Sequence, residues 1–389
     1  MRNIFVAATI FPFLCFQSLV FSQPFTLVKD INPGRLGLGV VREPVNLTES
    51  NGSIFFNIQT SGAPNGLWKS DGTEEGTVRF EGFSADKMIN VNGTLFFING
   101  SAFCKSDGTQ AGTEVVKTFS YKADNLTNVK GKLYFTVDVA KFTKVNDSVT
   151  YVSYDKELWK SDGTEGGTEA IKEFSYVQNM VAVGDLLFFS ANESAAPDRD
   201  FVKLWKSDGT PGGTLLVKDI YTGSWNANSP NFFNANGVLY FLGWEDTHGA
   251  ELWKSDGTEA GTVLIKDIEP GSDGITVSSF CMLNNNAYFF AKTPANVVGF
   301  WKTDGTAAGT LLVKDMGNFN PPSSLIRVNN TLFFSAYDNS VDRELWKSDG
   351  TTAGNVIVKN INRDGSSFPR NLIDVNGVLY FFADDNSVP

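Results

Sequence analysis

The sequence is poor in the side chains that most often bind transition metals or transfer protons near neutral pH. Its 389 residues include one histidine and three cysteines. Cys15 lies in an apolar N-terminal stretch, which leaves Cys104 and Cys281 for the rest of the chain. A fold built on disulfides uses more cysteines than this, so we expect two free, buried thiols. The same scarcity argues against a histidine- or cysteine-based metal centre, and we predict neither a metal site nor a cofactor.

Positive charge is also in short supply. The chain has 32 Lys and Arg against 43 Asp and Glu, which gives a formal net charge of −11. An acidic surface repels the phosphate backbone of nucleic acids and the head groups of anionic lipids. We therefore predict no nucleic-acid partner.

Amphipathic runs rich in Ala, Leu and Glu are absent, whereas glycine and aromatic residues are plentiful. The sequence has 37 Gly and 33 Phe, and aromatic residues make up 13% of it. This composition favours strands and tight turns over helices. The expected fold class is all-β.

Only one long apolar run occurs, and it lies at the N-terminus. Arg2 precedes a mostly apolar stretch from Ile4 to Phe21, and Val20 and Ser22 suit cleavage before Gln23. These features predict a signal peptide over residues 1–22. A permanent membrane anchor is the alternative, but the run is short for a membrane span. We expect a secreted or cell-surface protein that is not stably inserted in a membrane after cleavage.

The remaining chain is built from one repeating segment. Its motif, LWKSDGT or a close variant, occurs seven times, with spacings of 36, 55, 46, 48, 48 and 45 residues between equivalent positions. Repetition at this period predicts a repeat architecture. The copies span 67–73, 103–109, 158–164, 204–210, 252–258, 300–306 and 345–351.

Each repeat contains the signals of four strands, called A to D here. In residues 231–268, NFFNA is strand A, an Asn-Gly turn follows, and VLYFLGW is strand B. ELWKS is strand C, DGTEAG is a second turn, and TVLIKDI is strand D. Asn-Gly and Asp-Gly between apolar runs are strong hairpin signals, because their turns need positive φ.

Four antiparallel strands in each repeat of about 46 residues are typical of a β-propeller blade. We predict a single propeller domain over residues 23–389, with about eight four-stranded blades. An elongated β-solenoid is the rival architecture. Seven blades are complete, and residues 25–31 and 370–383 would form an eighth, shared by both termini. That blade lacks a strand C, so either it is short or the sequence is truncated at Pro389.

The recurring pattern ELWKSDGTxAGTxLVKDI resembles the bacterial ELWxxDGT repeat family. The resemblance covers nearly all of the chain from Phe25 to about Ala383. It implies a secreted or surface-exposed repeat protein, and it implies no catalytic residues. The second copy departs from the pattern because Cys104 replaces its Trp, and the last copy loses its second Gly-Thr.

The repeated Trp and Asp side chains are interpreted as structural. A Trp present in six of seven copies answers a need common to all repeats, such as packing between neighbours. The Asp is expected to accept backbone N–H bonds across the C–D turn rather than to bind a metal. A ligand platform for the Trp and a calcium site for the Asp are the alternatives. These residues are Trp68, Asp71, Trp159, Asp162, Trp205, Asp208, Trp253, Asp256, Trp301, Asp304, Trp346 and Asp349.

The parts that do not repeat are the candidates for binding, because function often lies in variable loops on a rigid scaffold. The predicted B–C loops include residues 138–157 and GWEDTHGA at 243–250. Only two Trp residues fall outside the motif, and the sole histidine accompanies one of them. The candidate ligand-binding residues are Trp225, Trp244, Glu245, Asp246 and His248.

These observations favour a non-catalytic protein, namely a ligand-binding, adhesion or scaffold propeller with a variable loop face. An extracellular glycan or a protein is the expected partner, and we expect a monomer. The alternatives are a carbohydrate-binding propeller, or a glycosidase or lyase acting on extracellular polysaccharide. A glycosidase needs paired carboxylates across a pocket, and the sequence indicates no such pair.

Overall fold

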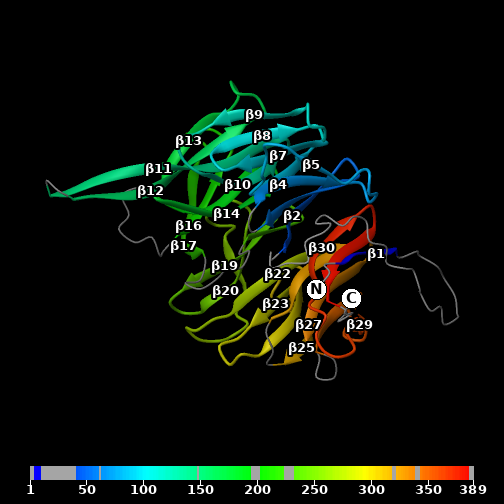
Figure 1. Ribbon diagram of the computed structural model, residues 1–389. Coiled ribbons are helices and arrows are strands. Elements are labelled where there is room, and N and C mark those ends of the chain that lie inside the picture. The colour runs from blue at the N-terminus through cyan, green and yellow to red at the C-terminus, as the bar shows by residue number, and fades with distance from the viewer. Residues whose placement is uncertain are drawn as a thin grey trace.

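The hairpin signals of the repeats correspond to antiparallel strands throughout the described part of the chain. The computed structural model describes residues 4–9, 41–60, 63–146, 149–193, 202–222, 232–317, 321–337 and 342–384. Within these ranges the chain consists of strands and turns, without a helix (Figure 1). No segment of them is therefore a helix that could cross a membrane. The all-β class is confirmed.

Seven units of four strands follow one another along these residues, and they are numbered here as the first to the seventh sheet, although strand pairing joins the fourth and fifth into one eight-stranded sheet. The first contains β2 (Val41–Ser50), β3 (Ser53–Thr60), β4 (Ala63–Ser70) and β5 (Val78–Phe80). The second contains β6 (Lys87–Val91), β7 (Thr94–Asn99), β8 (Ala102–Ser106) and β9 (Thr113–Thr118). The third contains β10 (Ala123–Val129), β11 (Lys132–Asn146), β12 (Val149–Ser161) and β13 (Glu169–Phe174).

The fourth sheet contains β14 (Tyr176–Val183), β15 (Leu186–Asn192), β16 (Lys203–Ser207) and β17 (Leu215–Thr222). The fifth contains β18 (Phe232–Ala235), β19 (Val238–Glu245), β20 (Gly249–Ser255) and β21 (Val263–Lys266). The sixth contains β22 (Thr276–Leu283), β23 (Asn286–Lys292), β24 (Val298–Thr303) and β25 (Leu311–Gly317). The seventh contains β26 (Ser323–Val328), β27 (Thr331–Tyr337), β28 (Arg343–Ser348) and β29 (Val356–Lys359).

The last sheet has three strands and combines both ends of the chain. It orders β1 (Ile4–Thr9), β31 (Val378–Ala383) and β30 (Arg370–Val375). β1 occupies the place expected for a strand C, although its residues belong to the predicted signal peptide. The predicted strand at 25–31 and the chain end at Pro389 lie outside the described residues.

The long segment at 138–157 was expected to be a loop, and this expectation is wrong. β11 and β12 stay paired past the motif, from Val137 opposite Glu157 to Asn146 opposite Val149. Figure 1 shows the pair projecting from the body as a two-stranded arm. Val and Thr recur in both halves of this segment, with Phe142 in the first and Tyr151 and Tyr154 in the second, and these residues favour a continued ladder.

The core consists of layers between consecutive sheets, not of one central cluster. Among the described residues, eight clusters of buried side chains occur, and each joins one sheet to the next. Strand B is buried on both faces, as its unbroken apolar run predicts. Cys104 is buried in the layer between the first and second sheets. Cys281 is half-buried, and both thiols are free.

The first and last sheets also adjoin. β2 contacts β30, as β2 contacts β6 and β26 contacts β30. Val375 joins Ile54 and Phe56 in one buried cluster. The amide of Asn371 donates to the carbonyl of Pro44 at 3.2 Å. The succession of sheets thus returns to its start.

The DGT turn of one sheet fits under an aromatic side chain of the preceding sheet. Gly305, in the sixth sheet, has φ +88°, and a Cβ there would overlap the hydroxyl of Tyr240 from the fifth sheet. Lys254 of the fifth sheet donates to the carbonyl of Gly305 at 2.9 Å. The same aromatic contact recurs at Gly163, Gly209, Gly257 and Gly350, against Phe96, Tyr134, Phe188 and Tyr288 respectively.

We predict that Gly305→Ala destabilises the protein by about 1–3 kcal/mol, because Ala at this φ is strained and its methyl group displaces Tyr240. Urea unfolding monitored by Trp fluorescence measures the change. Gly212→Ala is the matched control, since a Cβ at Gly212 meets nothing within 4 Å. Equal stability of the two variants would contradict this account of the turn.

Candidate functional site

The predicted binding residues of GWEDTHGA lie at the tip of a tight hairpin, not in a long loop. β19 continues through Trp244 and Glu245, and β20 begins at Gly249. Trp244 is opposite Ala250, and Glu245 is opposite Gly249. The turn is therefore only three residues long.

Local hydrogen bonds fix the turn. His248 Nδ1 lies 2.5 Å from Glu245 Oε1, and Thr247 Oγ1 lies 2.9 Å from the same nitrogen. A proton relay needs an acid on one ring nitrogen and a nucleophile on the other. Both partners here contact Nδ1, so these contacts fix the turn and do not form such a relay between the two ring nitrogens.

The segment that follows the fifth sheet packs against the backbone of the hairpin tip. Gly249 has φ +64°, and a Cβ there would lie 2.5 Å from the carbonyl oxygen of Ser272. At Gly274, with φ +66°, a Cβ would overlap the backbone of Ala250. The N–H of Ile275 donates to the carbonyl of Ala250 at 2.7 Å. Backbone thus packs directly on backbone here, which places the tip in a defined position.

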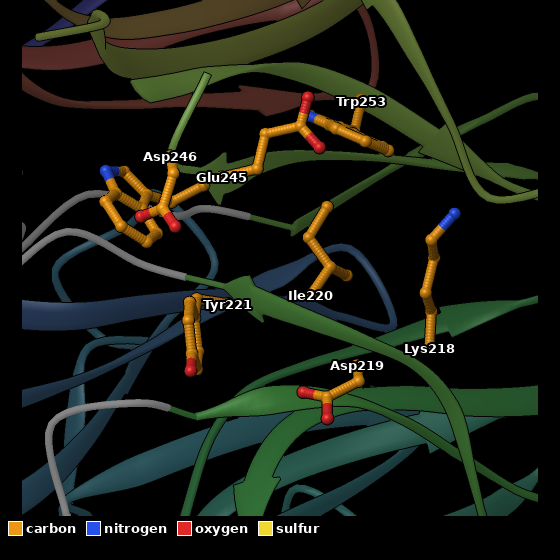
Figure 2. Close-up of a pocket in the computed structure, with 8 residues that line it drawn as sticks. Lys218, Asp219, Ile220, Tyr221, Glu245, Asp246 and Trp253 are labelled. Carbon is orange, nitrogen blue, oxygen red and sulfur yellow. The ribbon is translucent and has the colours of Figure 1, made fainter. Parts of the chain in front are cut away.

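A cavity of about 210 Å³ lies beside this tip, between the fourth and fifth sheets. Figure 2 shows its lining side chains, which come from β17, β19, the hairpin turn and β20. They are Lys218, Asp219, Ile220, Tyr221, Trp244, Glu245, Asp246 and Trp253. Three of the five predicted binding residues therefore meet at this cavity, and His248 contacts one of them. Trp225 lies outside the described residues.

Strand pairing between the two sheets forms one side of the cavity. Tyr221 at the end of β17 is opposite Trp244 of β19, and Thr222 is opposite Gly243. The rings of Tyr221 and Trp244 have centroids 5.7 Å apart and planes tilted by 42°. The aromatic pair is thereby held by backbone hydrogen bonds and does not depend on side-chain packing alone.

Trp253 contributes a buried hydrogen-bond donor to the same cavity. Its side chain is 5% exposed, and its Nε1 has no hydrogen-bond partner. In Figure 2 the indole nitrogen lies on the side of the ring toward Glu245. Lys218 covers the ring, with its ammonium 5.6 Å from the centroid, and donates to the carbonyl of Thr262 at 2.9 Å.

The charged groups around the cavity are mostly acidic. Asp219 pairs with Lys203 at 2.8 Å, and Glu245 contacts His248. Asp246 is exposed at the turn, and no described residue forms an ion pair with it. The cavity thus offers an anionic rim beside an aromatic wall.

The motif Asp residues are part of the C–D turns. Asp256 Oδ1 accepts the N–H of Thr258 at 2.8 Å and its hydroxyl at 2.7 Å, and these bonds lower the pKa of Asp256. Thr258 Oγ1 then accepts the N–H of Gly261. The same Asp-to-Thr bonds occur at Asp71, Asp107, Asp162, Asp208, Asp304 and Asp349. In the last copy, the amide of Asn355 replaces the second Thr hydroxyl and donates to Thr351.

The motif Trp residues pack between neighbouring sheets. Trp205 lies in one buried cluster with Phe174 of the third sheet and Leu187 of the fourth. The Lys172 ammonium of the third sheet lies 4.5 Å from a Trp205 ring centroid. Trp159, Trp253 and Trp346 are covered in the same way by Lys117, Lys218 and Lys314 of the preceding sheet.

Sequence reasoning missed the Glu of the ELW motif. Glu251 is fully buried, and its carboxylate accepts N–H bonds from Ile268 at 2.9 Å and Glu269 at 3.0 Å. Glu344, equally buried, bonds Ile361 and Ser367 in the same way. Each carboxylate anchors the segment that leads to the next sheet. The recurrence of Glu directly before Leu-Trp was the available signal.

Among the described residues, no group of three or more His, Cys, Asp or Glu is placed to hold a metal ion. Calcium would require six to eight oxygen ligands, and each turn Asp is already engaged with Thr. The turn carboxylates thus serve to hold the turns.

The fold resembles that of several solved hydrolases. A puromycin hydrolase matches with a TM-score of 0.51 and 10% identity, over 84% of this chain and 55% of that chain. A puromycin-hydrolyzing peptidase of Mycobacterium tuberculosis matches with 0.54 and 8%, over 84% and 54%. Prolyl oligopeptidase B of Galerina marginata matches with 0.52 and 10%, over 82% and 51%. At these identities the likeness establishes the fold.

The chain thus spans about half the length of these solved structures. No protein-family model and no curated protein matches the sequence.

These neighbours overturn the prediction of a non-catalytic adhesion, scaffold or ligand-binding protein. They are named as hydrolases and peptidases. The named neighbours are also not glycosidases or lyases, the alternatives considered from the sequence. The prediction failed because a repeated motif reports on packing between sheets and carries no information about the chemistry performed around the scaffold.

Burial raises the pKa of Glu251 to about 7, and the nearby charges of Asp267 and Glu269 add to the rise. In the unfolded chain this carboxyl titrates near 4.5. Below that pH the carboxyl is neutral in both states, so folding buries no charge. As the pH rises toward 7 the unfolded state loses its proton first, and stability falls.

We predict that Glu251→Gln removes this part of the pH dependence, which amounts to at most about 3 kcal/mol. Urea unfolding of both proteins between pH 4 and 8 measures it. The difference in stability between wild type and variant should shift in favour of the variant as the pH rises. Glu259→Gln, which removes an exposed carboxylate from the adjacent turn, is the control. A pH-independent difference between wild type and Glu251→Gln would contradict the assignment.

Proposed function

We propose that the eight sheets form one closed β-propeller, with both ends of the chain in the last blade. The buried layers between consecutive sheets support this arrangement, as does the contact between the first and last sheets. The likeness to the β-propeller domains of peptidases supports it further. A β-solenoid would leave its two ends apart, whereas here Asn371 bonds Pro44.

We further propose that this propeller is part of an enzyme that hydrolyses amide bonds. The observation that carries the proposal is the likeness to puromycin hydrolase, the puromycin-hydrolyzing peptidase and prolyl oligopeptidase B. The chain spans about half of each of these proteins. His248, the sole histidine, is held in the hairpin turn by its contact with Glu245. The propeller would therefore handle substrate for reacting groups carried by a separate catalytic unit.

The leader and the repeat pattern support two more proposals. The chain would belong with the bacterial ELWxxDGT repeat proteins, and it would act outside the cell or at its surface. A peptide substrate would then be extracellular.

We predict that the protein, purified at its natural length from its source, releases aminomethylcoumarin from aminoacyl or prolyl-peptidyl coumarin amides. Fluorescence of the released amine measures the rate. A parallel preparation from a strain without the gene should lack this activity, and returning the gene should restore it. Equal release with and without the gene, over a panel of such amides, would overturn the proposal.

A further inference from the structure

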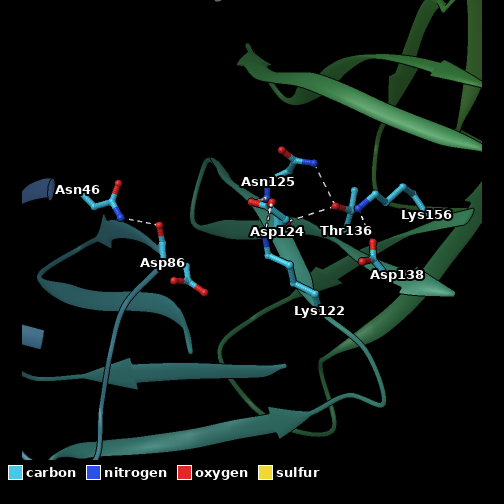
Figure 3. A network of polar contacts seen from close by, with 8 residues as sticks. All are labelled: Asn46, Asp86, Lys122, Asp124, Asn125, Thr136, Asp138 and Lys156. Atoms are coloured by element: carbon cyan, nitrogen blue, oxygen red, sulfur yellow. Dashed lines mark hydrogen bonds and ion pairs between the residues drawn. The ribbon is translucent and has the colours of Figure 1, made fainter. Parts of the chain in front are cut away.

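In two sheets, an acidic or aromatic residue of strand B has a cation directly opposite it on strand C, five rungs past the motif Ser. In the third sheet, Lys156 is opposite Asp138 and pairs with its carboxylate. Figure 3 shows this pair beside Thr136 and Asn125. In the seventh sheet, Arg343 is opposite Tyr337, and its guanidinium carbon lies 5.3 Å from the centroid of that ring. In both sheets, a cation of the chain itself thus contacts the acidic or aromatic residue on the opposite strand.

The fifth sheet has the aromatic and acidic residues without the cation. Trp244 occupies the rung that corresponds to Asp138 and Tyr337, and the residue opposite it is Ala250. Glu245 and Asp246 follow directly. The hairpin therefore presents an indole and two carboxylates. His248 is the only basic side chain that the hairpin itself places beside them.

The other nearby cations are already engaged. Lys203 is paired with Asp219. Lys218 lies over Trp253 and donates to Thr262. His248 contacts Glu245. Within the described residues the carboxylate of Asp246 is left without a positive partner, beside the cavity that Trp244 and Tyr221 line.

From this arrangement we infer that the cavity between the fourth and fifth sheets binds an organic ammonium ion. The positive group lies against the Trp244 and Tyr221 rings, which attract cations through their π faces. Asp246 and Glu245 supply the opposing charge. This assignment does not depend on the proposed amide hydrolysis.

The buried donor of Trp253 adds a second requirement. Trp253 is 5% exposed and its N–H is buried without a partner, so a hydrogen bond to an acceptor there lowers the free energy. A ligand with an oxygen acceptor near its ammonium group satisfies both features (Figure 2). The volume of about 210 Å³ is below that of drug-sized sites and suits a group of this size. A choline-like head group or the end of a lysine side chain meets these conditions.

The inference predicts that choline binds and that its uncharged isostere, 3,3-dimethylbutan-1-ol, does not. Titration of the full ¹⁵N-labelled chain measures binding, with the indole N–H resonances of Trp244 and Trp253 as reporters. These resonances are assigned with Trp244→Phe and Trp253→Phe. Added salt should weaken binding, because the rim charges are exposed.

Variants locate the site. Trp244→Ala should weaken choline binding about threefold to thirtyfold, the range for cation–π contacts. Asp246→Asn should weaken it about twofold to fivefold, as expected for an exposed charge pair. Asp315→Asn is the matched control, because it removes one exposed charge at the position in β25 that corresponds to Asp219. Asp246 is exposed, so its variant keeps the test valid even if Trp244→Ala fails to fold.

N-acetyl-lysine methylamide, titrated in parallel, separates the two sources of such a cation. Tighter binding of this compound assigns the site to a lysine side chain, and tighter binding of choline assigns it to a quaternary head group. The inference is overturned if neither cation binds at millimolar concentration, or if the neutral isostere binds as well as choline. Binding that Asp246→Asn and Asp315→Asn weaken equally would also overturn it.

Discussion

The structure depends on one contact that is repeated from sheet to sheet. From the second sheet to the seventh, the glycine of the DGT turn lies beneath an aromatic ring of the preceding sheet, as Gly305 lies beneath Tyr240. At four of these junctions a lysine of the preceding sheet also donates to the carbonyl of the same glycine, as Lys254 does. Each sheet is thereby aligned on its neighbour by shape and by hydrogen bonding together. Because a single sheet cannot bury both faces of its strand B, stability arises only when neighbouring sheets stack.

This contact explains why the most conspicuous motif residues are not the candidate site. Trp, Lys, Asp, Gly and Thr of the motif are all used in the turn or at the junction between sheets. The Asp and Thr groups have partners inside the turn, as Asp256 has in Thr258, and the Lys ammonium groups reach the neighbouring sheet, as Lys254 does. A binding site needs groups that the repeat leaves available. Such groups occur where one sheet departs from the others, at Trp244, Glu245 and Asp246 beside the cavity.

The proposed amide-hydrolysing enzyme and the proposed ammonium site are compatible but independent. The first is supported by a likeness of fold to hydrolases and peptidases. The second is supported by the chemistry of one cavity and by comparison with Lys156 and Arg343 in other sheets of the same chain. The buried Glu251 supports the position of the hairpin tip beside the cavity. It anchors the segment after the fifth sheet, and this segment in turn packs on the hairpin tip at Gly249 and Gly274.

The sequence by itself determined the period, the four strands of each unit and the turns, because Asn-Gly, Asp-Gly and apolar runs act locally. It also indicated Trp244, Glu245 and Asp246, since these residues interrupt the repeat. Only the tertiary structure decided that the segment at 138–157 is a paired arm and that GWEDTHGA has a three-residue turn. It alone placed Tyr221, Lys218 and Trp253 at the same cavity. Lys218 and Tyr221 lie on β17 and Trp253 lies on β20, and their meeting depends on β17 pairing with β19, a contact between sheets that no local pattern encodes.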